Sequence, residues 1–253
     1  QVKSSDYNKY HKPEVFVNHI WQINDKSNLS TTVYASWGRG YSYSGKANSD
    51  TYSEYDWYAA DYGKLNRTFR CPDGTFDYAA IENINISSEN GAQMIMSTNG
   101  ADQDWYGAVS TFSTNFLDCL AWHIGVDLRY YKANHVNRII DLYGGEYYID
   151  PSRENVSITD NVNATDEWKN EHLGIGDAIN RNYDSHIMQE GIFSQLEYTR
   201  NNYNIFISGT LNYSTYWRYD YLYYDPKNAR SKNIGFIGGN IKTGANYIIN
   251  KQF

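Results

Sequence analysis

The chain has 253 residues, with 26 Tyr and 7 Trp against only 3 Met, and a formal net charge of −7. No apolar run approaches the roughly 18 residues that mark a transmembrane helix, so a helical membrane protein is excluded. The acidic balance argues against a nucleic-acid-binding protein. A membrane β-barrel is not excluded, because alternation hides the apolar face of its strands from any window average.

Alternation of apolar and polar residues predicts a first hairpin, with strands over 15–23 and 29–39 and a polar turn over 24–28. Periodicity then disappears from 41 to 101, a stretch rich in Ser, Asn, Asp, Gly and Tyr. Such a stretch is too long for an ordinary connection. We expect a small helix in it around 78–84, and no strand pair.

Five more strands are predicted along the chain, with a second irregular region over 134–184. These strands cover 104–114, 120–130, 187–199, 203–221 and 234–250. The longest, 203–221, has an apolar face that includes Ile205, Ile207 and Leu211, and its opposite face is polar. Strands of soluble proteins usually run about 3–10 residues, and a membrane crossing needs about 9–11. This strand could therefore cross a bilayer and continue beyond it.

The connections between the predicted strands, about seven in number, run short, long, short, long, short, medium. This rhythm is typical of an antiparallel outer-membrane barrel, which has short periplasmic turns and longer extracellular loops. Cys71 would then lie in an outer loop and Cys119 beside a periplasmic turn, so we expect the two to remain unbonded. An open sheet edge cannot face lipid, and bacterial barrels have an even number of strands. We therefore expect residues 1–253 to be part of a larger barrel domain.

An ordered series of segments carries a further signal, at 10–13, 17–21, 29–40, 105–107, 125–131, 141–145, 191–198 and 242–247. These segments resemble the TonB-dependent outer-membrane receptors, especially those of Bacteroidetes. The resemblance implies a barrel of about 22 strands, closed by an N-terminal plug domain, in the bacterial outer membrane. It also implies import of a small nutrient, driven by an inner-membrane energy-coupling complex that pulls on the plug. A surface lipoprotein often accompanies such importers.

The sequence departs from the pattern of that family in one respect. It has no recognisable plug domain and no energy-coupling box near its start. Transport is therefore implied for the complete protein rather than by residues present here. A passive porin and a soluble β-rich glycan-binding module remain as alternatives.

Aromatic residues of the first irregular region allow two interpretations. They could pack as a small core of the loop, or they could help to form an outer vestibule for the ligand, since loops on a rigid scaffold commonly carry binding. The candidates for ligand contact are Trp57, Tyr58 and Tyr62 in this loop, with Trp105 and Tyr106 near the start of the next strand.

His123, Asp127 and Arg129 share one face of a predicted strand. We expect them to face the barrel lumen, where they could pair with neighbouring strands, line the pathway or hold the plug. The same alternation points Arg218 and Asp220 toward the vestibule. Aromatic side chains on the apolar faces are predicted to form the girdle at the membrane interface, with a sugar-stacking platform as the alternative. They are Trp122, Tyr130, Tyr213, Trp217, Tyr219 and Tyr247.

No catalytic set and no cofactor site is predicted. The sequence contains neither G-x-S-x-G nor H-E-x-x-H. Acidic residues of the irregular regions could supply oxygen ligands for Ca²⁺, but they lack the spacing of a calcium loop and are expected to be solvated. They are Asp73, Asp77, Asp160, Asp166 and Glu167.

Overall fold

The computed structural model describes residues 1–4, 7–48, 51–58, 60–61 and 64–249. Its main feature is one antiparallel sheet of eight strands in the order β1-β3-β6-β7-β8-β9-β10, with β2 also paired to β3. The strands are β1 (Asn8–His11), β2 (Glu14–Asn24), β3 (Ser27–Ala47), β6 (Met94–Leu117), β7 (Leu120–Asp141), β8 (Ala178–Arg200), β9 (Tyr203–Asp220) and β10 (Ile234–Tyr247). The predicted all-β class and antiparallel meander are confirmed.

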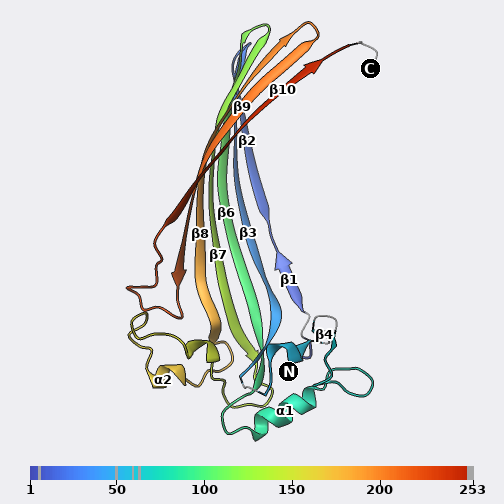
Figure 1. Ribbon diagram of the computed structural model, residues 1–253, viewed down its shortest axis with the longest axis vertical. Coiled ribbons are helices and arrows are strands. Elements are labelled where there is room, and N and C mark those ends of the chain that lie inside the picture. The colour runs from blue at the N-terminus through green and yellow to red at the C-terminus, as the bar shows by residue number, and fades with distance from the viewer. Residues whose placement is uncertain (5–6, 49–50, 59, 62–63, 250–253) are drawn as a thin grey trace.

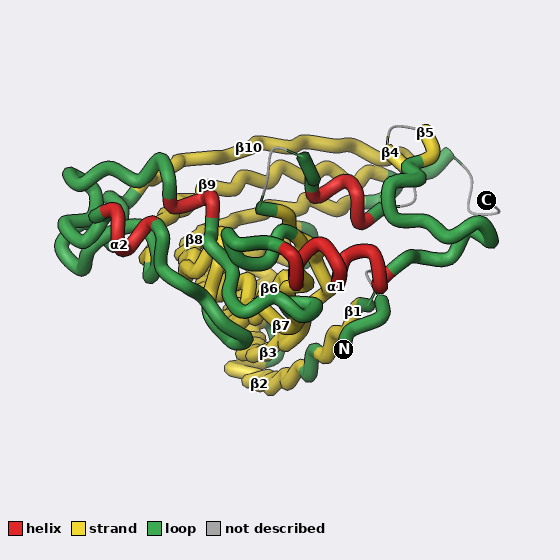
Figure 2. The backbone as a smooth tube through the Cα atoms, turned by 90° about the horizontal axis from the view of Figure 1, so that it is seen from below, coloured by secondary structure: helices red, strands yellow, loops and turns green. Residues whose placement is uncertain are grey.

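The connections alternate in length as predicted, and they give the sheet two different ends (Figure 1). Tight turns join the strands at one end, at 25–26, 118–119 and 201–202. The long connections gather at the other end, which we call the loop end, at 48–93, 142–177 and 221–233. Figure 2 shows the helices and loops lying across the strand ends there. Cys71 and Cys119 lie at opposite ends and are free thiols, as predicted.

The first edge of the sheet is a single strand interrupted at Lys12 and Pro13. β1 pairs with residues 39–42 of β3, and β2 pairs with residues 27–36 of the same strand. Proline cannot donate a ladder hydrogen bond, so it breaks the strand here. Its carbonyl accepts the N–H of Trp37 at 3.1 Å. Counting β1 and β2 as one, the sheet has the seven strand positions predicted, and within the described residues it does not close.

The strands extend further toward the loop end than the alternation predicts. β3 continues to Ala47 and β6 begins at Met94, inside the region expected to be irregular. β7 likewise continues to Asp141, and β8 begins at Ala178. Loop residues cover both faces of the sheet here, so apolar side chains occur on both faces. The two-residue period in hydropathy is then lost, although the hydrogen-bonded ladder continues.

The long connections contain short elements of their own. The first holds η1 (Glu54–Trp57), the unpredicted strand pair β4 (Ala60–Asp61) and β5 (Lys64–Leu65), and α1 (Tyr78–Ser87); the second holds η2 (Pro151–Arg153) and α2 (Asp166–Lys169). The helix expected around 78–84 is confirmed as α1. Its N-cap is Asp77, whose Oδ1 accepts the N–H of Ala80 at 3.0 Å. None of the described helices is long and apolar enough to span a bilayer.

Two small hydrophobic cores pack on opposite faces of the sheet at the loop end. The first, the outer-loop core, consists of Trp57, Phe69, Ile81, Met94, Met96 and Tyr143. The second, the second-loop core, consists of Ala92, Ile95, Ile139, Leu142, Tyr148, Leu173 and Ile179. Met94 and Met96 flank Ile95 in β6, and neighbouring residues of a strand point to opposite faces. The outer-loop core therefore covers one face and the second-loop core covers the other, and each connection contributes one residue, Ala92 or Tyr143, to the core of the other.

Asn85 of α1 ties the two long connections together. Its side chain is buried, and its Nδ2 donates to the carbonyls of Met94 at 2.7 Å and Leu142 at 2.8 Å. Its Oδ1 accepts the N–H of Gln93 at 2.9 Å and of Met94 at 3.1 Å. One amide thus satisfies backbone groups from both connections, which would otherwise be buried without partners.

Candidate functional site

The register divides the sheet into two chemically different faces. Directly paired residues of antiparallel strands point to the same face, and we call a row of them across β3, β6, β7, β8 and β9 a rung. One rung is Thr31, Ser110, Val126, Ile192 and Leu211, and the next on the same face is Val33, Ala108, Leu128, Glu190 and Tyr213. This apolar face carries every aromatic residue predicted for the girdle. We call the two rungs named above the apolar band, and Glu190 is the charged residue in it.

The opposite, polar face presents a wall of hydrogen-bonding side chains. A cavity of about 250 Å³ on it is lined by Asp127, Arg129, Gln189, Gly191, Asn212 and Ser214, and also by Glu190, which the register places in a rung of the apolar face. Arg129 donates to both carboxylate oxygens of Asp127, from Nη2 at 2.8 Å and from Nε at 3.2 Å. Such bidentate pairs are geometrically specific. Both side chains remain part-exposed, 44% for Arg129 and 28% for Asp127, so they are available to a further partner.

His123 also lies on the polar face, as predicted for a lumen-facing residue. Its Nδ1 is 2.9 Å from the hydroxyl of Ser113 on the neighbouring strand. The structure thus brings His123, Asp127 and Arg129 to one face. His123 bonds across strands, whereas Asp127 and Arg129 bond each other within β7.

Arg218 and Asp220 at the loop end of β9 differ from each other. Arg218 lies 5.1 Å from the ring centre of Tyr183 and keeps 44% of its side chain exposed. Asp220 is only 2% exposed, and its Oδ1 accepts the N–H groups of Leu222 and Tyr223. The prediction that Asp220 faces the vestibule is therefore wrong, because its carboxylate holds the turn that follows β9.

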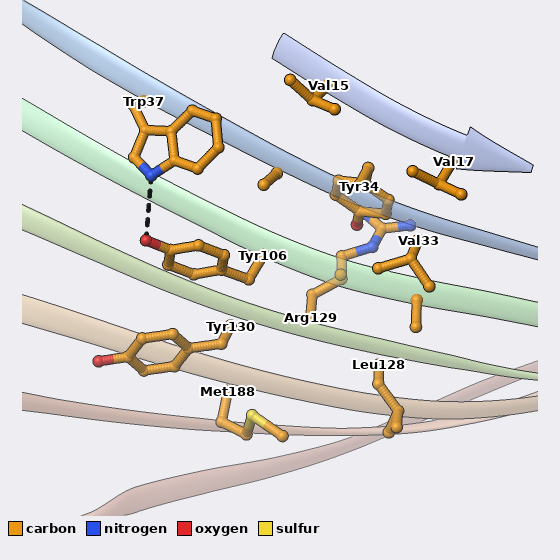
Figure 3. Close-up of a pocket in the computed structure, with 13 residues that line it drawn as sticks. Val15, Val17, Val33, Tyr34, Trp37, Tyr106, Leu128, Arg129, Tyr130 and Met188 are labelled. Atoms are coloured by element: carbon orange, nitrogen blue, oxygen red, sulfur yellow. Dashed lines mark hydrogen bonds between the residues drawn. The ribbon is translucent and has the colours of Figure 1, made fainter. Parts of the chain in front are cut away.

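Trp105 and Tyr106 lie inside β6, as the strand predicted over 104–114 requires, so neither belongs to a loop. Being adjacent, they point to opposite faces. Trp105 packs against Tyr131 on the polar face, with ring centres 4.5 Å apart. Tyr106 lies on the apolar face, where its hydroxyl accepts the indole N–H of Trp37 at 3.1 Å (Figure 3). Of the two, Trp105 alone remains a candidate for ligand contact.

The aromatic residues of the first long connection also separate into different roles. Trp57 is completely buried in the outer-loop core, and its indole donates to the carbonyl of Lys46 at 3.1 Å. The interpretation as a loop core is confirmed for Trp57, and it cannot contact a ligand. Tyr58 is 40% exposed. Tyr62 lies outside the described residues.

The acidic loop residues form no cation site in the part of the chain that the structure describes. No three His, Cys, Asp or Glu side chains there come close enough to hold a metal ion. Asp73 instead accepts the N–H and hydroxyl of Thr75, at 3.0 and 2.7 Å, and these hydrogen bonds lower the pKa of its carboxyl. Asp77 caps α1.

Sequence reasoning did not single out Gln189, Asn212 and Ser214 of the polar wall. Asn212 and Ser214 occupy even positions of the 203–221 pattern, so the alternation already gives their face. What brings them beside Asp127 and Arg129 is the register of β7, β8 and β9. Register depends on turn geometry that the alternation does not specify.

Comparison with known proteins identifies the fold. No protein-family model and no curated protein matches the sequence. The unliganded ferric citrate transporter FecA is similar over 98% of this chain and 26% of its own, with 8% identity and a TM-score of 0.56. The ferric-catecholate import receptor Fiu from E. coli K12 covers 98% of this chain in both forms. In the closed form the match covers 32% of the Fiu chain, with 8% identity and a TM-score of 0.49. In the open form it covers 35% of the Fiu chain, with 10% identity and a TM-score of 0.47.

The chain thus spans about a quarter to a third of the length of the chains that it matches. The likeness to FecA extends over almost the whole of this chain. On the match to FecA, the sheet resembles the barrels of TonB-dependent receptors. The fold of this chain is accordingly that of a section of a TonB-dependent receptor barrel.

Proposed function

We propose that this chain forms part of the barrel wall of an energy-coupled receptor, which takes up a small nutrient across the bacterial outer membrane. The observation that carries the proposal is the separation of an apolar and a polar face across the sheet. A wall between lipid and an aqueous lumen needs this arrangement, because charged groups on the lipid side are costly. The likeness to FecA adds support at the level of the fold.

In this proposal the apolar face contacts lipid and the polar face lines the lumen. The tight turns lie in the periplasm, and the long connections lie outside the cell. Asp127 and Arg129, half-exposed on the polar face, offer both signs of charge to a plug domain carried by the complete protein. Trp105 and Tyr131, nearer the loop end of that face, offer an aromatic surface to a ligand that enters from outside.

The remaining elements of the proposal concern the complete protein. It would consist of residues 1–253 together with further strands and a plug, and an inner-membrane complex would pull on that plug. The series of strand segments supports the Bacteroidetes type of receptor, in which a surface lipoprotein could cover the vestibule. Ligand capture by the loops would use the exposed Tyr58 and the part-exposed Arg218. The chain has no catalytic role in this scheme.

Paired cysteine labelling tests the facing. In a C71S/C119S background of the complete protein, Leu211→Cys and Asn212→Cys place one thiol on each face. We expect a water-soluble maleimide to label the Asn212→Cys thiol. We expect a lipid-dissolved quencher to reduce the fluorescence only of a fluorophore attached to the Leu211→Cys thiol. Labelling of the Leu211→Cys thiol from water would contradict the proposal.

Two further measurements separate the alternatives. A passive porin would conduct ions in a planar bilayer without any ligand, whereas a plugged receptor would stay closed. A soluble glycan-binding module would leave the membrane fraction without detergent, whereas a barrel would require detergent for release.

A further inference from the structure

A second hollow lies on the apolar side of the sheet, close to the loop end. It has a volume of about 380 Å³, and its walls include Lys132, Asp184, His186, Trp217 and Arg230. Lys132, His186 and Trp217 belong to one rung, which continues through Asp104 to Trp37. The hollow therefore faces the same side as the lipid-facing band of the proposed function, and not the lumen.

The hollow has an excess of positive charge. Asp184 is 6% exposed, and its carboxylate is fully engaged by the ammonium of Lys132 at 2.8 Å, by Asn134 at 2.9 Å and by the hydroxyl of Tyr221 at 2.8 Å. Arg230 donates to Asn233 at 2.8 Å and to the carbonyl of Ser231 at 3.3 Å. Among the described residues no carboxylate lies within ion-pair distance of Arg230. Two cations thus face one carboxylate, and Arg230 is left to meet an external anion.

The hollow also contains an ordered aromatic surface. The rings of His186 and Trp217 stack with centres 4.9 Å apart and planes 1° from parallel. The hydroxyl of Tyr130 lies 2.8 Å from Nδ1 of His186 and fixes that ring. Arg230 lies 5.7 Å from the ring centre of Trp217. An aromatic plane beside a guanidinium suits a sugar ring that carries an anionic group.

An apolar hollow adjoins this polar one along the strands. It has a volume of about 400 Å³, and its walls include Val33, Leu128, Tyr130 and Met188 (Figure 3). Tyr130 and Met188 form the rung next to that of Lys132 and His186 on the same face. Rungs two residues apart are separated by about 7 Å along a strand. A single amphiphile could therefore place its head in the polar hollow and a chain over the apolar one.

We propose that these two hollows form a site for an anionic glycolipid of the outer leaflet. Its phosphorylated sugar would lie between Arg230, Lys132 and Trp217, and an acyl chain would follow Tyr130, Met188 and Leu128 toward the bilayer centre. The inference rests on the proposed function, because it requires the apolar face to meet lipid. It adds a lipid-binding site that is separate from any ligand in the lumen.

The test uses the complete protein, delipidated in a nonionic detergent, and measures bound lipid by native mass spectrometry. The probes are bisphosphorylated lipid A, its dephosphorylated form, phosphatidylglycerol and inorganic phosphate. We expect bisphosphorylated lipid A to bind most tightly, and Arg230→Gln to weaken it about fivefold, the effect of removing one surface cation. Lys242→Gln is the matched control, since it removes one positive charge from the polar face of β10.

Several outcomes would overturn the site. Equal binding of bisphosphorylated lipid A by wild type and Arg230→Gln would show that the guanidinium takes no part in the site. An equal loss of affinity in Lys242→Gln would show that general charge attraction accounts for the binding. Equal binding of phosphatidylglycerol or of dephosphorylated lipid A would refute the phosphorylated sugar. Competition by inorganic phosphate at the same concentration would show that the acyl chain plays no part.

A failure of the proposed function is recognised separately. Water labelling of the Leu211→Cys thiol would contradict the lipid-facing wall itself, whatever the lipid titration gives. Correct labelling together with unselective lipid binding would reject this site alone. Retention of the heat-modifiable migration typical of folded barrels would show that Arg230→Gln is folded.

Discussion

The indole of Trp57 packs directly over Gly45 of β3. A Cβ added at Gly45 would lie 2.1 Å from the Trp57 ring, which leaves room only for glycine. We therefore predict that Gly45→Ala displaces Trp57 and destabilises the outer-loop core by about 1–3 kcal/mol, the usual cost of overpacking. Hydrogen exchange in residues 54–87 should become faster.

Gly238 of β10 provides the control for this substitution. No atom lies within 4 Å of a Cβ placed there. Gly238→Ala should therefore leave exchange in residues 54–87 unchanged. Unaltered exchange in Gly45→Ala as well would show that Trp57 is not anchored at this position.

Removal of the Asn85 side chain should loosen both long connections at once. Asn85→Ala leaves the N–H of Gln93 and the carbonyl of Leu142 buried without their partner. We expect local stability to fall by at least about 2 kcal/mol, because an unsatisfied buried group costs about 1–3 kcal/mol. Limited proteolysis should then cut in 142–177 as well as in 48–93, whereas Asn90→Ala, an exposed change, should leave both intact. Cleavage of the first connection alone would contradict the bridging role.

The two faces of β9 should respond in opposite ways to charge. Leu211→Arg places a cation in the middle of the apolar face and should cost about 2–4 kcal/mol of folding free energy in lipid. Asn212→Arg, one residue further, places it on the polar face and should be tolerated. Urea unfolding in lipid vesicles measures both, and equal losses would show that the faces are wrongly assigned.

Glu190 is the exception within the apolar band, lying between Leu128 and Tyr213 in its rung. An ionised carboxylate facing lipid is unfavourable, although less so than a cation. Glu190→Gln should therefore raise the unfolding free energy in vesicles by about 1 kcal/mol. A decrease would mean that the charge has a partner in the membrane.

The loop end should lose stability in strong alkali. Burial raises the pKa of Tyr223 to about 12, and its hydroxyl donates to Ser152 at 2.6 Å. The ordinary tyrosine pKa is about 10, so between these values the unfolded chain loses its proton while the folded chain keeps it. The contribution of Tyr223 is complete below pH 10 and declines as the pH rises through about 12.

Tyrosinate absorbance checks this order of titration. Tyr143 and Tyr148 should titrate late for the same reason, since burial raises the pKa of each. Tyr223→Phe should remove one late-titrating tyrosine and flatten the alkaline loss. Titration of all tyrosines together near the ordinary pKa would exclude the burial of these rings.

The middle of the sheet was predictable because one physical rule, alternation, applies to it without interruption. Residues 203–213 follow that rule at every step except Phe206, and their faces were assigned from sequence alone. Between Trp37 or Trp217 and the loop end, the long connections cover both faces of the sheet. Tyr41 and Tyr43 in β3 then lie in a regular strand that the same rule misses.

The candidate site was only partly predictable for a related reason. The face of Asp127 and Arg129 follows from sequence, but their neighbours Gln189 and Asn212 depend on register. Asp220 obeys the alternation and yet serves a turn, because a short carboxylate beside free N–H groups bonds them first. Trp57 shows the corresponding limit for loops, where composition does not distinguish a buried ring from an exposed one.

The placement of the two hydrophobic cores on opposite faces has an evolutionary consequence. Trp57, Phe69 and Ile81 of the first connection pack against the side of the sheet that looks away from the lumen in the proposed barrel. In that barrel, sequence change there would alter the loop surface without altering the wall that lines the lumen. Tyr148 and Leu173 of the second connection lack this freedom, because the second-loop core lies on the inner side. Diversity among close relatives should therefore concentrate in the first connection.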